Sequence, residues 1–316
     1  MSTPPVRILP GLAALTAVAA LAGACGGASS PASSSTTSSS TTGATTATTN
    51  TTKTGQGKVD VLYAGSLVAL MEHKVGPAFD SATGYTFRGF AGGSTGLAKE
   101  IRGKVRQGGV FVSASPKADQ ALMGSANGSW VSWYATFAKS PLVLGYNPKS
   151  RFAVQLRSKP WYQVVTEPGF RLGRTDPTLD PKGKLIVKAL DQAAGAHHAP
   201  ALRKLTTTTT GVYPEASLVG RLQAGQLDAG FFYSVEASAA HIPTVPLPGV
   251  HLGATYTVTV LRGAPDQAGA VSFAKFLLGT KGSGLLRAAG LDPVAPVVTG
   301  PASAVPAGLR SALHGP

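Results

Sequence analysis

The sequence is poor in the residues that hold small or metal-bound scaffolds together. Its 316 residues include one cysteine, which excludes a disulfide scaffold and a cysteine-rich zinc or iron–sulfur site. Only 13% of the residues are charged, against about 25% in typical soluble domains, and 14 acidic residues stand against 28 Lys and Arg. The 39 glycines follow no three-residue period and no heptads persist, which excludes collagen-like and coiled-coil chains. A basic globular protein of about two domains remains.

The first 25 residues are typical of an export signal. Arg7 precedes an apolar run over residues 8–22, which is too short to span a bilayer comfortably. Residues 21–25 read Leu-Ala-Gly-Ala-Cys, which resembles a bacterial lipoprotein cleavage box with its leucine one position early. We expect a signal peptide over residues 1–24 and lipidation of Cys25. The alternative is an ordinary signal in which Cys25 is incidental or removed.

A low-complexity segment follows the cysteine. Between residues 29 and 54, 19 of 26 residues are Ser or Thr, and such a tract cannot bury enough apolar surface to offset its ordering entropy. As a flexible coil, about 30 residues reach roughly 30 Å root-mean-square. We therefore assign residues 25–57 to the lipidated cysteine and a disordered tether, and a glycosylated stalk would serve the same purpose.

The remaining residues alternate between strand-like and helix-like patterns. The strand-like segments are residues 59–64, 85–91, 109–114, 170–174 and 229–233, and the helix-like segments are residues 67–79, 97–102, 185–194 and 218–227. This alternation predicts α/β architecture with mostly parallel sheets. The length favours two such lobes over one large sheet.

Three predicted strand ends carry a small hydroxyl residue at the turn into the next helix. They are Gly65-Ser66, Gly93-Ser94 and Ser113-Ala114. Taken singly, each serine is well placed as a helix N-cap. Taken together, free N–H groups, hydroxyls and glycines that permit close approach suit a small multivalent oxyanion, held by neutral hydrogen bonds without a buried Lys or Arg.

An enzymatic alternative rests on Ser94. Residues 92–96 match G-x-S-x-G, the nucleophile elbow of α/β-hydrolases, between a predicted strand and helix. Only 37 residues separate the tether's end at Gly57 from Ser94, too few for the strands that precede this elbow. The possible partners His197, His198, His241, His251 and His314 lie in segments that the pattern does not bring to Ser94, and His197-His198 is interpreted as a solvated pair.

Residues 58–316 resemble the periplasmic-type binding proteins for molybdate and tungstate that serve ABC importers, the archaeal-style branch especially. The motifs that carry this resemblance, in order, lie at residues 63–67, 91–94, 99–101, 110–114, 133–144, 161–162, 173–183, 225–228, 231–235 and 273–279. The paired Asp-Pro units at Asp176 and Asp180 are the most distinctive.

The resemblance implies a two-lobed α/β fold of the type II periplasmic-binding-protein class, with the ligand in a cleft between lobes joined by two crossing strands. Lobe I would comprise residues 58–140 and 258–316, and lobe II residues 141–257. It also implies ligand-binding residues. Ser66, Ser94, Asp180 and Tyr233 are the principal candidates, and Gly65, Gly93, Ser113, Ala114 and Asp176 are weaker ones. Asp176 and Asp180 are equally interpretable as turn residues and helix caps.

Several positions depart from the family pattern. Phe232 stands where the archaeal branch has a second acidic ligand, so the resemblance implies tetrahedral binding through hydrogen bonds rather than six-coordinate expansion of the metal. Gly109 replaces an acidic residue, and Lys184-Leu185 replaces Tyr-Arg. These changes leave the scaffold intact and leave the identity of the ligand open.

We therefore expect a non-enzymatic receptor without cofactor, exported and anchored by lipid to the outer face of the cytoplasmic membrane. As a monomer, it would deliver molybdate or tungstate to an ABC permease and ATPase. Sulfate and phosphate are the nearest alternatives, and a pair of lobes kept for sensing or adhesion is another. The basic residues are scattered without a basic-aromatic motif, so nucleic-acid binding is not expected.

Overall fold

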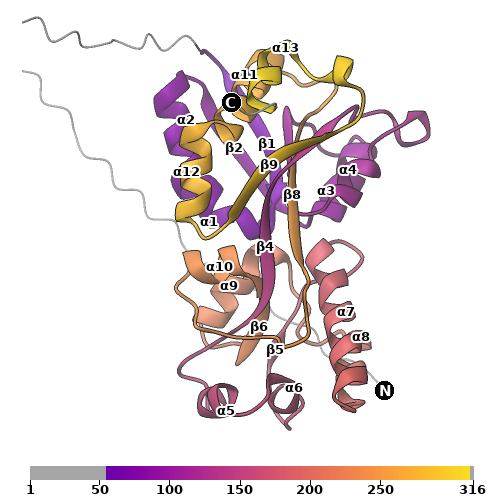
Figure 1. Ribbon diagram of the computed structural model, residues 1–316, viewed down its shortest axis with the longest axis vertical. Helices are drawn as coiled ribbons and strands as arrows, with labels where there is room; N and C mark the ends of the chain where they lie inside the picture. Colours follow the sequence, from indigo (N-terminus) through magenta and orange to yellow (C-terminus); the bar gives the residue numbers. More distant parts are fainter. Residues whose placement is uncertain (1–54, 314–316) are drawn as a thin grey trace, which may run out of the picture. The chain divides into compact units, whose positions relative to one another are not determined.

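The computed structural model describes residues 55–313. The predicted signal peptide, Cys25 and tether residues 25–54 lie outside the described residues. No helix within residues 55–313 combines the length and the apolar character that crossing a membrane requires. The described chain alternates strands and helices (Figure 1), which confirms the predicted α/β class.

Nine strands in the described part form one sheet. Their order is β2-β1-β3-β8-β4-β6-β5, and β7 and β9 also pair with β4. The strands are β1 (Lys58–Ala64), β2 (Thr86–Gly92), β3 (Val110–Ser113), β4 (Tyr134–Tyr146), β5 (Leu172–Gly173), β6 (Ala229–Tyr233), β7 (Thr244–Val245), β8 (Gly253–Val260) and β9 (Asp292–Thr299).

The prediction of mostly parallel sheets is wrong. β1 pairs in parallel with β2 and β3, and β5 with β6, as helical crossovers require. The pairings of β8 with β3, and of β4 with β6, β7, β8 and β9, are antiparallel. The long strand β4 therefore makes most of the antiparallel pairings in the sheet. Local sequence patterns do not indicate these pairings, because the partner strands are distant in the chain.

β4 connects two parts of the molecule (Figure 1). Its residues 135–141 pair with β8, and its residues 142–146 pair with β6. We call the part built on β1, β2, β3 and β9 the first lobe and the part built on β5, β6 and β7 the second lobe. β4 and β8 run between them, and the lobe boundaries drawn from the sequence stay a prediction.

The helices of the first lobe flank its strands. Figure 1 places α2 and α12 on one side and α3 and α4 on the other. They are η1 (Gly65–Leu67), α1 (Val68–Leu70), η2 (Met71–Val75), α2 (Gly76–Thr83), α3 (Ser94–Arg102), α4 (Pro116–Gln120), η3 (Ser125–Asn127), α11 (Gln267–Leu278), α12 (Thr280–Ala288), η4 (Ala302–Ala304) and α13 (Ala307–Leu313).

Residues 65–83 form one helical run, as the spacing of their apolar residues predicts. Its π-helical segment η2 lies just before Pro77, which has no N–H for the regular helical ladder. The run ends at Gly84, whose φ of 86° lies in the left-handed region that favours glycine. Phe79 packs against Tyr85, Phe273 and Phe276, so this run closes one side of the core.

The helices of the second lobe are α5 (Ala153–Ser158), α6 (Trp161–Val164), α7 (Pro181–Ala196), α8 (Ala201–Thr207), α9 (Glu215–Gln223) and α10 (Ser234–Ala239). α7 buries an apolar face that includes Ile186, Leu190 and Ala193.

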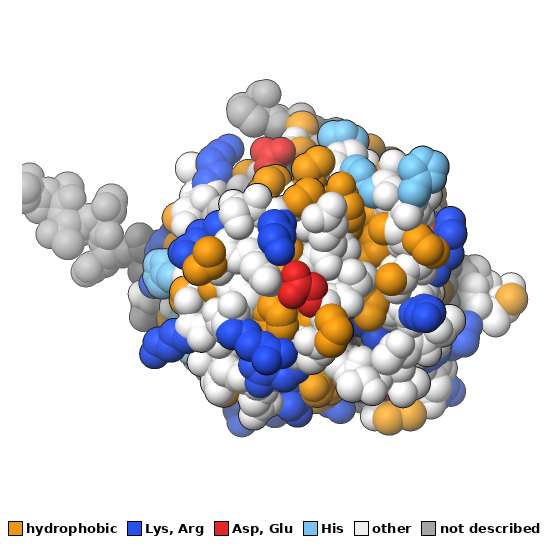
Figure 2. Space-filling model, turned by 90° about the horizontal axis from the view of Figure 1, so that it is seen from below, with side chains coloured by type: hydrophobic (Ala, Val, Ile, Leu, Met, Phe, Trp, Pro, Cys, Tyr) orange, Lys and Arg blue, Asp and Glu red, His pale blue; other side chains and the backbone are white. Residues whose placement is uncertain are grey.

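Lys and Arg side chains are spread singly over the end of the molecule seen in Figure 2 rather than gathered into one patch.

One buried carboxyl group ties α4 to the crossing strand β8. Asp119 is fully buried, and its Oδ2 accepts a hydrogen bond of 2.5 Å from Thr257 Oγ1. Its Oδ1 has no hydrogen-bond partner among residues 55–313. Burial raises the pKa of Asp119 to about 7, because the charged form loses its hydration.

This pKa predicts a pH-dependent stability. A raised carboxyl pKa favours folding below the unfolded-state value of 3.8, and this contribution is lost as the pH rises through about 7. We expect the free energy of unfolding of the wild type to fall relative to that of Asp119→Asn by up to about 4 kcal/mol between pH 4 and 8. Urea unfolding at a series of pH values measures this difference. The exposed Asp191→Asn is the control, and parallel profiles of Asp119→Asn and the wild type would contradict the prediction.

Candidate functional site

The serines at the three strand ends of the first lobe are buried, but they do not act as simple helix caps. Gly93 rather than Ser94 is the N-cap of α3, and Ser94 Oγ accepts a hydrogen bond of 3.0 Å from the N–H of Ala114. Ser66 Oγ lies 2.9 Å from Tyr256 Oη, at hydrogen-bond distance. Ser113 Oγ bonds to the backbone of Ser115. Two strand ends are thereby joined, and the Ser66 hydroxyl lies beside the crossing strand β8.

The second lobe presents Asp180 at the start of α7. Oδ1 of Asp180 caps this helix by accepting a bond of 2.8 Å from the N–H of Lys182. Its buried Oδ2 has no hydrogen-bond partner within the described range. Asp180 therefore combines the expected capping role with a free, buried acceptor. Asp176, by contrast, is only partly buried, and its Oδ1 accepts bonds from the N–H and hydroxyl of Thr178, as a turn residue does.

A buried lysine lies among three acidic side chains. Lys182 Nζ donates to both carboxylate oxygens of Glu236 at 2.8 Å and forms an ion pair of 3.3 Å with Glu215 Oε1. Glu236 Oε2 also accepts a bond of 2.7 Å from the N–H of Tyr233. A buried lysine therefore lies close to the expected site, paired with carboxylates.

Glu215 brings a second free carboxyl group to the site. Apart from the ion pair of its Oε1 with Lys182 at 3.3 Å, neither of its buried oxygens has a hydrogen-bond partner within residues 55–313. A Cβ placed on Gly65 would lie 3.0 Å from Glu215 Oε2, so this carboxyl group from α9 reaches the first lobe beside Ser66. The tetrahedral binding expected from Phe232 stays a prediction, and Glu215 places a carboxyl group from another element at the same junction of the lobes.

Two tyrosines complete the cluster. The rings of Tyr233 and Tyr256 meet edge to face with centroids 6.2 Å apart, and both side chains are fully buried. Tyr233 Oη is without a hydrogen-bond partner in the part of the chain that the structure describes. Hydroxyl groups and unpartnered acceptors thus lie close together, buried where the lobes meet.

Burial governs the protonation of the acidic groups. It raises the pKa of Asp180 to about 7, with the charge of Glu215 adding to the shift and Lys182 opposing it. Burial likewise raises the pKa values of Glu215 and Glu236, again against the effect of Lys182. Each carboxyl group is therefore easier to protonate than an exposed one, and the state of the cluster depends on Lys182.

The lobes touch at a second place. A Cβ on Gly93 would lie 2.5 Å from the carbonyl oxygen of Leu179, and the N–H of Gly96 donates to the same oxygen at 2.8 Å. Lys99 Nζ donates to the carbonyl oxygen of Thr178 at 3.1 Å. The N-terminus of α3 and the segment before α7 therefore close one edge of the site.

The sequence did not single out Lys182, Glu215 or Tyr256 as site residues. Lys182 follows an Asp-Pro unit, and Glu215 follows Pro214, so both stand at helix starts where polar residues are ordinary. No local pattern indicates that these two helix starts meet. The hydrolase alternative gains no support, because Ser94 Oγ bonds to a backbone N–H, with no histidine within hydrogen-bond reach among the described residues. His197 stacks on Tyr162 at 4.0 Å rather than being simply solvated.

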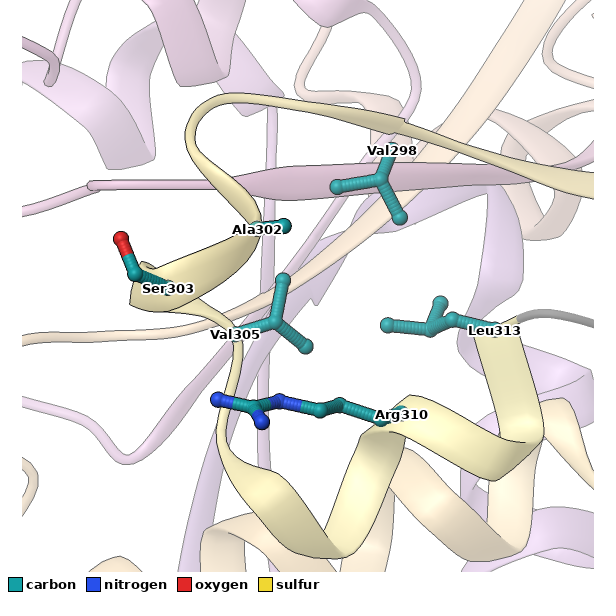
Figure 3. A pocket seen from close by; sticks show the side chains of 6 residues that line it. All are labelled: Val298, Ala302, Ser303, Val305, Arg310 and Leu313. Atoms are coloured by element: carbon teal, nitrogen blue, oxygen red, sulfur yellow. The ribbon is translucent and has the colours of Figure 1, made fainter.

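The cavities of residues 55–313 include two of interest outside this cluster. A cavity of about 350 Å³ near the end of the described chain is mainly apolar, and Figure 3 shows the side chains of Val298, Val305 and Leu313 converging there beside Arg310. A cavity of about 190 Å³ lies at the edge of the candidate site, with Lys117 and Lys184 from opposite lobes in its lining. Within residues 55–313, no group of three or more His, Cys, Asp and Glu residues is arranged to hold a metal ion.

Comparisons with known proteins agree with this architecture. The profile of the family described as "Bacterial extracellular solute-binding protein" matches residues 59–292. A putative ABC transporter molybdenum-binding protein of Haloferax volcanii is 31% identical over 248 residues, covering 71% of this chain and 78% of the relative. The molybdate/tungstate-binding protein WtpA of Pyrococcus abyssi is 24% identical over 305 residues, covering 78% and 88%.

Among solved structures, the periplasmic molybdate-binding protein of Azotobacter vinelandii matches with a TM-score of 0.57 at 20% identity. The match covers 74% of this chain and 98% of that one. It confirms the predicted two-lobed fold of the type II periplasmic-binding-protein class.

The contact between Gly93 and Leu179 generates a prediction. Gly93 has φ −62° and ψ 125°, which alanine adopts freely, so Gly93→Ala should disturb only the approach of the lobes. We expect the N–H of Gly96 to exchange with solvent at least about tenfold faster. This corresponds to a decrease of about 1.4 kcal/mol in the free energy of local opening. Amide hydrogen exchange measures this rate. Gly284→Ala, which meets nothing within 4 Å, is the control, and unchanged exchange in Gly93→Ala would contradict the prediction.

Proposed function

Because the chain belongs to the family of bacterial extracellular solute-binding proteins, we propose that it captures molybdate or tungstate outside the cytoplasm for an ABC importer. The family consists of extracytoplasmic solute-binding transport proteins. The observation that carries the choice of ligand is the buried set of unpartnered polar atoms between the lobes: Asp180 Oδ2, Glu215 Oε2 and Tyr233 Oη. Unpartnered buried polar atoms are costly, and a bound oxyanion would give them a function.

The hydroxyl groups suit the oxygen atoms of such an anion. Ser66, Ser94 and Tyr233 each carry a hydroxyl group that can donate a hydrogen bond to a negatively charged oxygen, and all three side chains are buried. Because Gly65 and Gly93 have no side chain, the backbone of the first lobe can lie close to Glu215 and Leu179 of the second lobe. Ser113 and Ala114 contribute mainly by fixing the strand end against Ser94.

The two free carboxyl groups favour molybdate and tungstate over sulfate and phosphate. Molybdenum and tungsten can raise their coordination number by taking carboxylate oxygens, whereas sulfur and phosphorus in these anions cannot. Asp180 and Glu215 offer such oxygens from two different helix starts of the second lobe. A fully deprotonated sulfate would be best bound by hydrogen-bond donors alone. This cleft also contains carboxylate acceptors, so it suits sulfate less well.

Closure of the lobes would signal the bound state. The contacts of Leu179 with Gly93 and Gly96, and of Glu215 with Gly65, join the lobes at the site itself. A ligand that adds bonds to both lobes would stabilise this closed arrangement against an open one through hinge motion. The closed form, as a monomer, would dock on the permease that works with the ATPase.

The ligand panel that tests this function is a thermal-shift assay of the purified protein with molybdate, tungstate, sulfate and phosphate. A ligand at about 100 times its Kd stabilises by about 2.7 kcal/mol, which shifts the Tm of a protein of this size by several degrees. We expect a shift with molybdate and tungstate, and its loss in Ser94→Ala at the same ligand concentration. Ser303→Ala, at an exposed position, is the matched control.

The other outcomes of this panel are informative. A shift with sulfate or phosphate alone would keep an oxyanion receptor but overturn the assignment of the ligand. The absence of a shift with all four anions would contradict oxyanion capture by this site.

The leader supports a membrane-anchored receptor. We infer that residues 1–24 are removed, that Cys25 carries lipid, and that the Ser/Thr-rich tether gives the receptor a reach of roughly 30 Å from the membrane. Cys25→Ala should then be released from the membrane fraction into the soluble extracytoplasmic fraction, since it loses its acyl chains. Fractionation with immunoblotting measures the partition, and wild-type protein found only in the soluble fraction would contradict the anchor.

A further inference from the structure

We propose that Lys182 supplies the fixed positive charge on which anion binding at this site depends. The proposal rests on the proposed function and adds to it a residue that sets the affinity for a doubly charged anion through charge, without contacting the ligand. Lys182 is fully buried, and no other Lys or Arg side chain takes part in the salt bridges of this cluster within residues 55–313.

Lys182 connects every ligand-bearing element of the second lobe. Its backbone N–H donates to Asp180 Oδ1 at 2.8 Å. Its ammonium holds Glu236, which in turn accepts the N–H of Tyr233. The same ammonium lies 3.3 Å from Glu215, whose carboxyl group adjoins Gly65 of the first lobe. A change in its charge would therefore act on Asp180, Glu215 and Tyr233, the ligand positions proposed for the second lobe.

The balance of charge in the cluster explains why the lysine matters. Asp180, Glu215 and Glu236 provide three carboxyl groups around one ammonium, and the other titratable groups that face them are Tyr233 and Tyr256. A dianion entering this space would meet excess negative charge, and Lys182 is the only group in the described part of the cluster that opposes it. Charge interactions of this kind are strong here because water is excluded.

The location of Lys182 on α7 is unusual for a purely structural residue. The rest of the buried face of this helix is apolar, with Ile186, Ala189, Leu190 and Ala193 packed in the core. An apolar side chain at position 182 would fill the same space without the cost of burying a charge. The lysine is instead held by carboxylates at the edge of the candidate site.

A ladder of charge substitutions tests this role. The dissociation constants of molybdate and tungstate are measured by isothermal titration calorimetry for the purified wild type, Lys182→Met, Glu236→Gln and the double variant. Lys188→Met changes the charge of the same helix by the same amount at an exposed position and is the matched control. The amide introduced by Glu236→Gln keeps an oxygen that can accept the N–H of Tyr233 and a proton of Lys182.

We expect Lys182→Met to weaken binding by at least about 30-fold, the lower end for losing one partner of a buried charge pair. Glu236→Gln should strengthen binding by about fivefold or more, because Lys182 is then less neutralised. The double variant, whose net charge equals that of the wild type, should return to within about threefold of it. Lys188→Met should bind as the wild type does.

The direction of the change in Glu236→Gln separates charge from structure. If this variant loses affinity as Lys182→Met does, or if the double variant stays as weak as Lys182→Met, the pair acts only as a structural brace and the proposal is overturned. If Lys182→Met does not fold, Glu236→Gln alone decides. A wild-type protein that binds none of the oxyanions would overturn the proposed function instead.

Discussion

Three carboxyl groups and one lysine buried where the two lobes meet are the constraint on which the rest of the site depends. Charges of this kind are tolerated in a protein interior only when they are paired, hydrogen-bonded or protonated. Lys182 and Glu236 satisfy each other, whereas Asp180 and Glu215 keep oxygens without partners in the described chain. The cluster is therefore incomplete as a purely structural element, and an anion bound with its metal atom near the free carboxyl groups would complete it.

The two lobes meet at backbone positions that lack a side chain. Gly65 and Gly93 stand where a Cβ would meet Glu215 or Leu179, so the lobes approach each other through glycine on the first-lobe side. The last residues of the crossing strand β4 pair with β6 of the second lobe, and its earlier residues pair with β8 beside the first lobe. Under the proposed function, rotation about the crossing strands would change all of these contacts together and so couple occupancy of the site to the surface that a permease recognises.

Much of this arrangement follows from the sequence, and the limits have a physical reason. β6 was predicted over its observed residues, and the helical run after β1 and the serines at the strand ends follow from local periodicity and turn chemistry. The antiparallel role of β4, and the meeting of Lys182, Glu215 and Glu236, depend on contacts between residues far apart in the chain. The Phe232 position shows the same limit, because the sequence around it does not indicate that the carboxyl group of Glu215 from α9 lies buried in the same cluster.

The central claim is that one metal oxyanion lies between the lobes among Ser66, Ser94, Asp180, Glu215 and Tyr233. Crystals of the purified protein grown with tungstate and measured at the tungsten absorption edge test it most directly. The account predicts a single strong anomalous peak within bonding or hydrogen-bonding reach of these side chains, with the lobes closed. A peak elsewhere, or no peak in a protein that retains the closed arrangement, would contradict it.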